Sequence, residues 1–118
     1  MGAGAARNRG IQETTGELVA FLDGDDLWLP HKLERQLEYL ADHPESVMVS
    51  CLRWRWDQTT SERHIENFGV RPGQSLALEN VVRNVIGNPS MTLIRRSVFD
   101  AVGQFDPALR WGQDWDLF

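Results

Sequence analysis

The sequence predicts a single domain with an α/β layered fold, and three observations support this prediction. Short apolar runs that suit buried strands alternate with amphipathic segments that suit helices. The first of these runs stops abruptly at a group of aspartates, and ligands of open α/β sheets bind beyond strand ends of this kind. The chain has 118 residues, of which 42% are hydrophobic and 25% charged. That composition suits one globular domain, so we expect a single unit over residues 1–118.

The first half of the chain contains the end of a helix, a strand and a second helix. Thr15 and Gly16 form a stop signal for the helix that precedes them. Residues 17–22 are nearly all apolar and suit a strand that is buried on both faces. Pro30 fits the first turn of the second helix. An apolar stripe at helical spacing then follows, formed by Leu33, Leu37 and Leu40.

The second half continues the alternation of strands and helices. We expect strands over residues 46–54 and 91–94, and helices over residues 76–86 and 97–102. Residues 57–73 are polar and suit a loop, with an irregular strand inside it as the alternative. Gly103 ends the helix before it, because glycine readily adopts the backbone conformation that closes a helix. Residues 111–118 begin a further helix.

Charge and cysteine content narrow the classes of function. The formal net charge is −5, which argues against a nucleic-acid partner. Cys51 is the one cysteine, so the chain forms no internal disulfide and no cysteine-rich zinc site. No apolar run is long enough to span a bilayer. We expect a cytoplasmic protein, either free or peripheral at the inner membrane face.

The acidic group Asp23-Gly24-Asp25-Asp26 is the strongest chemical signal in the chain. Closely spaced carboxylates repel one another, so together they favour a cation. Oxygen ligands suit Mg²⁺ or Mn²⁺, and these ions commonly bridge carboxylates and a substrate's phosphates. The same residues also suit a plain turn in which Asp26 caps the following helix.

Two further residues, Arg7 and Asp114, have side chains that suit ligand binding or catalysis. Arg7 would neutralise a metal-bound diphosphate through forked hydrogen bonds, although a solvated surface arginine is an equal alternative. Asp114 lies between Gln113 and Trp115, with Trp111 shortly before it. Aromatic neighbours partly shield a carboxylate from water, which helps it accept a proton, and aromatic rings also stack on sugars. The alternative for Asp114 is a simple helix cap.

Taken together, these segments resemble family 2 glycosyltransferases. The matching segments, in chain order, are Ala6-Arg7-Asn8-Arg9-Gly10, residues 16–26, Leu29-Pro30 with Lys32-Leu33, Gly103-Gln104-Phe105-Asp106 and Gln113-Asp114-Trp115. The family usually reads Gly-Gly-Phe-Asp at the fourth of these. The resemblance covers nearly the whole chain, and residues 51–85 are its least specific part.

The resemblance implies a partial GT-A fold, Rossmann-like with a mixed sheet, and an inverting transfer of a sugar from a nucleotide-diphosphate donor to an acceptor hydroxyl. It makes Asp23 and Asp25 the Asp-X-Asp pair that binds Mn²⁺ or Mg²⁺ and the donor, with Arg7 near the nucleotide. Asp114 becomes the catalytic base. The positions expected to meet the sugar and acceptor are Trp111, Gln113 and Trp115.

The implied partners are a nucleotide-diphosphate sugar and a glycan, lipid or protein acceptor, as in cell-wall or polysaccharide biosynthesis. The family's first strands and later helices have no counterpart here, so we expect a domain shortened at both ends, which is inactive alone or pairs as a homodimer. Two alternatives stay open. One is a haloacid-dehalogenase-type phosphotransferase with Asp23 as nucleophile, and the other is a non-catalytic remnant or interaction domain.

Overall fold

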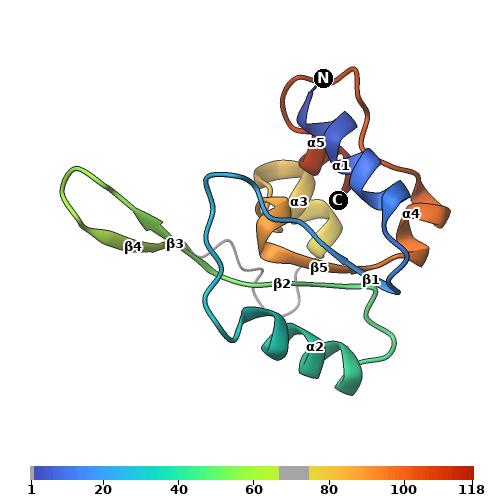
Figure 1. Ribbon diagram of the computed structural model, residues 1–118, viewed down its shortest axis with the longest axis horizontal. Coiled ribbons are helices and arrows are strands. Elements are labelled where there is room, and N and C mark those ends of the chain that lie inside the picture. Colours follow the sequence, from blue (N-terminus) through green and yellow to red (C-terminus); the bar gives the residue numbers. More distant parts are fainter. Residues whose placement is uncertain (1, 67–74) are drawn as a thin grey trace.

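The computed structural model describes residues 2–66 and 75–118, and its architecture is α/β as expected (Figure 1). A sheet of three short strands forms the middle layer. Helix α2 covers one face of this sheet, and α1, α4 and α5 lie over the other. The helices are α1 (Ala3–Glu13), α2 (Lys32–Asp42), α3 (Leu76–Arg83), α4 (Ser97–Val102) and α5 (Gln113–Leu117), with the 3-10 helix η1 (Pro89–Met91).

The sheet is built around β5 (Thr92–Arg95), which lies between β1 (Leu18–Ala20) and β2 (Met48–Ser50). Both neighbours run antiparallel to β5, with Val19 opposite Ile94 and Val49 opposite Leu93. The expected mixed sheet is therefore seen, in the described residues, as antiparallel pairs alone. The first three residues of β5 are buried, because the strand has neighbours on both sides and helices on both faces.

The strand expected over residues 17–22 is confirmed, but its burial on both faces is not. Only Val19 is buried within β1, and Leu22 is half exposed. The reason is position, because β1 lies at the edge of the described sheet and pairs with β5 alone.

The hydrophobic core lies between the sheet and the layer formed by α1, α4 and α5. Phe105 is its most central aromatic residue, 1% exposed, and its backbone N–H and C=O both pair with the side-chain amide of Asn8 at 3.0 and 2.8 Å. Phe21 packs edge-on against Phe99 and Phe105. The buried members of this cluster are Ile11, Val19, Ile94, Phe99 and Phe105.

Helix α2 forms where the leucine stripe predicts it, but it presents a different face to the sheet. Leu40 is buried, whereas Leu37 is 47% exposed. Gln36 takes the inward position one turn before Leu40 and donates a hydrogen bond to the carbonyl of Met91 at 2.8 Å. This bond ties α2 to the start of the central strand.

The polar segment after β2 is a hairpin, and the alternative of a strand within the expected loop over residues 57–73 is confirmed by β4. Strand β3 (Arg53–Trp56) pairs with β4 (Arg63–Glu66), and Figure 1 shows the hairpin standing away from the sheet. The carboxylate of Asp57 accepts hydrogen bonds from the backbone N–H groups of Thr59 and Thr60 and organises the turn. The rest of that expected loop, residues 67–74, lies outside the described residues.

Glycine ends or begins the last two helices as the sequence indicates. Gly103 follows α4 with a φ of 92°, and Gly112 precedes α5 with a φ of 68°. Both angles lie in the left-handed region, where a side chain would be strained. The strand and the helix expected over residues 91–94 and 97–102 are confirmed.

Two adjacent arginines at the end of β5 secure the ends of two different helices. Arg96 donates to the carbonyls of Ile11 and Gly16 at 2.8 and 2.5 Å, and to the hydroxyl of Thr14 at 2.8 Å, at the end of α1. Arg95 donates to the carbonyl of Leu40, at the end of α2, at 3.0 Å. A cation at a helix C-terminus satisfies free carbonyls and opposes the helix dipole.

We expect Arg96→Ala to lower the free energy of unfolding by about 2 kcal/mol, because three acceptors lose a charged donor. Urea unfolding would measure the change. Arg35→Ala is the control, since Arg35 is exposed and its ion pair with Glu38 is 3.7 Å long. Equal effects of the two substitutions would contradict the capping role.

Candidate functional site

The acidic turn follows directly on β1 and is held by the segment that precedes β5. The backbone N–H of Asp26 donates to the carbonyl of Asp23 at 3.0 Å, which confirms the turn. Asp26 does not cap the following helix as expected, because α2 begins later and has His31 at its N-cap. The backbone N–H of Asp23 donates to the hydroxyl of Ser90 at 2.9 Å. Because Ser90 lies in η1 and is buried, the first aspartate has a fixed position at the end of the strand.

Arg7 and Asp23 form a close ion pair across the top of the sheet. Nη2 of Arg7 lies 2.7 and 2.8 Å from the two carboxylate oxygens of Asp23. The arginine side chain is 15% exposed and the aspartate side chain 31%. The guanidinium also lies over the ring of Phe105, 5.5 Å from its centroid. Partial burial strengthens such a pair relative to one on an open surface.

Gln113 brings α5 to the same place. Its Oε1 accepts from Nη1 of Arg7 at 3.5 Å, and its Nε2 donates to the carbonyl of Leu109 at 2.5 Å. Gly4 makes room for it, since a Cβ on Gly4 would lie 3.2 Å from the Gln113 amide. Three segments that are far apart in the sequence therefore meet, from α1, from the end of β1 and from α5.

The other predicted site residues surround this meeting point less closely. Asp25 is exposed on the turn, and Asp114 is half-buried in the first turn of α5, next to Gln113. Trp111 is 88% exposed. Trp115 is 42% exposed, and its indole N–H donates to the carbonyl of Asn80 in α3. The structure thus joins Arg7, Asp23 and Gln113 by contacts, whereas Trp111 and Asp25 lie on the surface.

The donor atoms of the turn suit a hard divalent cation. Across residues 2–66 and 75–118 no cluster of three or more His, Cys, Asp or Glu side chains is formed. Asp23 and Asp25 nevertheless offer carboxylate oxygens alone, and Mg²⁺ is commonly bound by one or two carboxylates together with substrate phosphates. The residues present therefore fit such an ion when a phosphate supplies further oxygens.

The sequence did not point to Asn88 and Trp28, whose side chains hold the acidic turn in place. Asn88 donates from its amide nitrogen to Asp26 Oδ2 at 3.1 Å, and Trp28 donates to the carbonyl of Ser90 at 2.9 Å. Oδ1 of Asn88 is buried and has no hydrogen-bond partner among the described residues. The one signal for this role was the position of Asn88 and Ser90 just before a strand, which brings them to the same end of the sheet as the aspartates.

Lys32 and Cys51 form a second titratable pair behind Trp28. The ammonium of Lys32 lies 4.3 Å from the centroid of the Trp28 ring. Burial lowers the pKa of Lys32, and burial likewise raises the pKa of the Cys51 thiol, while each charge partly offsets the shift of the other. The raised pKa keeps the Cys51 thiol protonated at neutral pH, so it is not an activated nucleophile.

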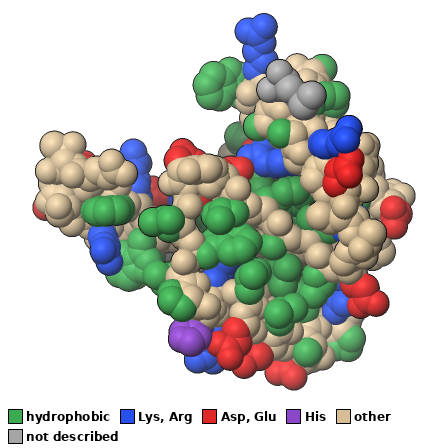
Figure 2. All heavy atoms as spheres, in the orientation of Figure 1, with side chains coloured by type: hydrophobic (Ala, Val, Ile, Leu, Met, Phe, Trp, Pro, Cys, Tyr) green, Lys and Arg blue, Asp and Glu red, His purple; other side chains and the backbone are tan. Residues whose placement is uncertain are grey.

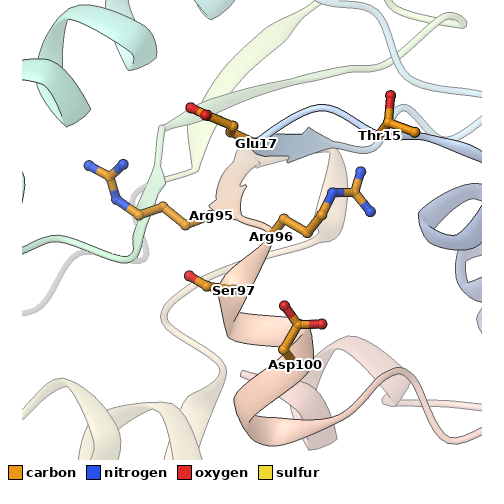
Figure 3. A pocket seen from close by; sticks show the side chains of 6 residues that line it. All are labelled: Thr15, Glu17, Arg95, Arg96, Ser97 and Asp100. Carbon is orange, nitrogen blue, oxygen red and sulfur yellow. The ribbon is translucent and has the colours of Figure 1, made fainter.

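The surface hollow in Figure 3 lies elsewhere. Its lining residues come from the start of β1, the end of β5 and α4, which is the opposite end of the strands from Asp23. Arg95 and Arg96 line it, and both already bind helix ends. The two arginines of this hollow therefore have a structural role. Among the described helices, none has the length and apolar character needed to cross a bilayer.

Comparison with known proteins identifies similarity to glycosyltransferases along most of the chain. Residues 1–103 match Glycosyl transferase family 2. TuaG of Bacillus subtilis, a glycosyltransferase proposed for teichuronic acid biosynthesis, is 49% identical over 114 residues, which are 96% of this chain and 42% of that protein. The amylovoran biosynthesis glycosyltransferase AmsE of Erwinia amylovora is 36% identical over 63 residues, 53% of this chain and 24% of its own length.

An uncharacterized glycosyltransferase of Rickettsia felis is 31% identical in an alignment of 121 residues that covers 99% of this chain and 20% of that protein. The chain thus spans less than half the length of each of these three relatives. The family match covers most of the chain, including the acidic turn, and implies a GT-A type fold for the layers described above. The chain belongs to glycosyl transferase family 2.

Proposed function

We propose that this chain carries the donor site and the base of an inverting glycosyltransferase, which moves a sugar from a nucleotide-diphosphate donor to an acceptor hydroxyl. The observation that carries the proposal is the contact between Arg7, Asp23 and Gln113. It fixes the first acid of the Asp-X-Asp pair beside the helix that bears Asp114. A donor site and a base must lie close together for a single displacement.

Asp23, Asp25 and Arg7 bind the donor in this proposal. Asp23 and Asp25 hold Mg²⁺ or Mn²⁺, which when bound offsets the negative charge that builds on the leaving diphosphate. Arg7 presents a planar guanidinium with several N–H donors, and phosphate oxygens suit this group as well as the carboxylate it now contacts. Arg7 therefore provides a second positive charge for the diphosphate.

Asp114 is the proposed general base. Its position directly after Gln113, in the first turn of α5, supports this role, and so does its half-buried setting. Asp114 takes the proton of the acceptor hydroxyl while the oxygen attacks the sugar from the side opposite the leaving group. Trp111, Gln113 and Trp115 are the proposed contacts for the sugar and acceptor.

The relatives favour a glycan as the acceptor. TuaG and AmsE are both named for the biosynthesis of a polysaccharide. We therefore place this chain in polysaccharide assembly. The phosphotransferase alternative finds no support in the family match.

We expect UDP or GDP to bind this chain in a Mn²⁺-dependent way in calorimetric titration. Asp25→Ala should weaken that binding by more than about tenfold, because even outer-shell partners of a metal contribute that much. Asp100→Ala is the matched control, since Asp100 is an exposed aspartate in α4, at the opposite end of the strands. If neither nucleotide binds with metal, or if Asp25→Ala binds as well as the unchanged chain, the donor-site proposal fails and a non-catalytic role is favoured.

Asp114→Asn should reduce the rate of sugar transfer by about 10²- to 10⁴-fold and leave nucleotide binding unchanged, because asparagine keeps the shape but accepts no proton. Release of the nucleoside diphosphate from a nucleotide sugar, in the presence of a glycan acceptor, measures the rate. Asp116→Asn, an exposed position in the same helix, should keep the full rate. An Asp114→Asn variant that retains the full rate would exclude this residue as the base.

A further inference from the structure

The β3–β4 hairpin sorts its side chains onto two unlike faces. Residues directly opposite one another in an antiparallel pair share a face, and successive residues alternate between faces. The register pairs Trp54 with Ile65 and Trp56 with Arg63. These four residues therefore share one side of the hairpin, which we call the tryptophan face. The opposite side holds Arg53, Arg55, His64 and Glu66.

The apolar side chains of the tryptophan face are exposed to solvent. Trp54, Trp56 and Ile65 are 54%, 51% and 55% exposed. The guanidinium of Arg63 lies over the ring of Trp56, 5.7 Å from its centroid. The hairpin stands away from the sheet in Figure 1, and Figure 2 shows its lobe separated from the main body, with basic and hydrophobic side chains on it. Large exposed aromatic residues grouped on one face commonly mark a binding surface.

The two strands of the hairpin carry more basic than acidic side chains, and the two acidic residues of the tip, Asp57 and Glu62, bring the hairpin as a whole to no net charge. Its eight strand residues include three arginines and one glutamate, whereas the whole chain has a net charge of −5. Glu66 lies 2.6 Å from Arg53 and 3.7 Å from Arg55, on the face away from the tryptophans. Arg63 therefore gives the tryptophan face a positive charge, which is complementary to an anionic partner.

We propose that the tryptophan face binds an acidic oligosaccharide, which is the growing glycan that serves as acceptor. This inference rests on the proposed function. The face of an indole ring is electron-rich, so it attracts the C–H groups of a sugar ring. Trp54 and Trp56 lie about 6.8 Å apart along the strand and offer two successive rings to a chain of sugars. Arg63 pairs with a carboxylate or phosphate on that chain.

The tip of the hairpin argues against a membrane as the partner. Its residues 57–62 are all polar, and Asp57 and Glu62 add two negative charges. Hydrogen bonds from the backbone of Thr60 and then Thr59 hold the pKa of Asp57 below its usual range, so this carboxylate stays ionised. A charged, polar tip of this kind does not enter an acyl layer.

Calorimetric titration without nucleotide or metal would test the proposal. The probes are a tetramer of galacturonic acid, a neutral tetramer of glucose, and vesicles of mixed phosphatidylcholine and phosphatidylglycerol. We expect the acidic tetramer to bind about tenfold more tightly than the neutral one, and the vesicles not to bind. Because no donor is present, this result is independent of whether the donor site binds UDP or GDP.

Substitutions on the two faces of the hairpin distinguish the contribution of aromatic stacking to the affinity from the contribution of charge. Arg63→Gln should lower the affinity for the acidic tetramer to that for the neutral one, whereas Arg55→Gln, on the opposite face, should leave it unchanged. Trp56→Ala should weaken both tetramers about tenfold, and Trp56→Phe should retain most of the affinity because it keeps an aromatic ring and supports the hairpin.

Three outcomes would overturn the proposal. One is equal affinity for the acidic and neutral tetramers. Another is an equal loss for Arg55→Gln and Arg63→Gln, which would show a general charge effect rather than a site. The third is binding to anionic vesicles that depends on Trp56 while the acidic tetramer does not bind, which would assign the face to a lipid surface.

Discussion

The pairing of β5 with strands on both of its sides is the interaction on which the rest of the structure depends. Within the described residues, β5 is the one strand with two neighbours, and its first three residues are buried. The residues that flank it organise other parts of the chain. Ser90, before the strand, fixes Asp23, and Arg95 and Arg96, at its end, secure α2 and α1. A short central strand thus positions the site and the helices around it.

The ion pair between Arg7 and Asp23 connects this scaffold with the chemistry we propose. The arginine offsets the negative charge of Asp23, which lies close in the chain to Asp25 and Asp26. In the function we propose, a bound cation gives Asp23 a positive partner and the diphosphate gives Arg7 a negative one. Each of the two side chains therefore has a second partner of opposite charge. In the same proposal, the contact between Arg7 and Asp23 organises the donor site in advance, which lowers the entropic cost of donor binding.

In the functions we propose, the acidic turn recognises the donor and the tryptophan face recognises the acceptor. The turn carries carboxylates, which need a cation to accept a polyanion. The tryptophan face carries an arginine and two open indole rings, which suit an acidic glycan without a metal. This separation allows donor and acceptor to be recognised by different parts of one acidic chain, each through its own chemistry.

Local sequence determined most of the elements and the identity of the acidic motif. Glycine at 103, the apolar run before Asp23 and the leucine spacing of α2 act over a few residues, so their effect is visible in the sequence. Tertiary structure decided which face of α2 is buried, because the inward place of Gln36 depends on a carbonyl of Met91 far along the chain. It also decided that a polar stretch is a hairpin, since strand pairing depends on register between two segments. The contact of Arg7 with Asp23 and Gln113 likewise needed the fold, because only the packing of α1 and α5 over the sheet brings these three side chains together.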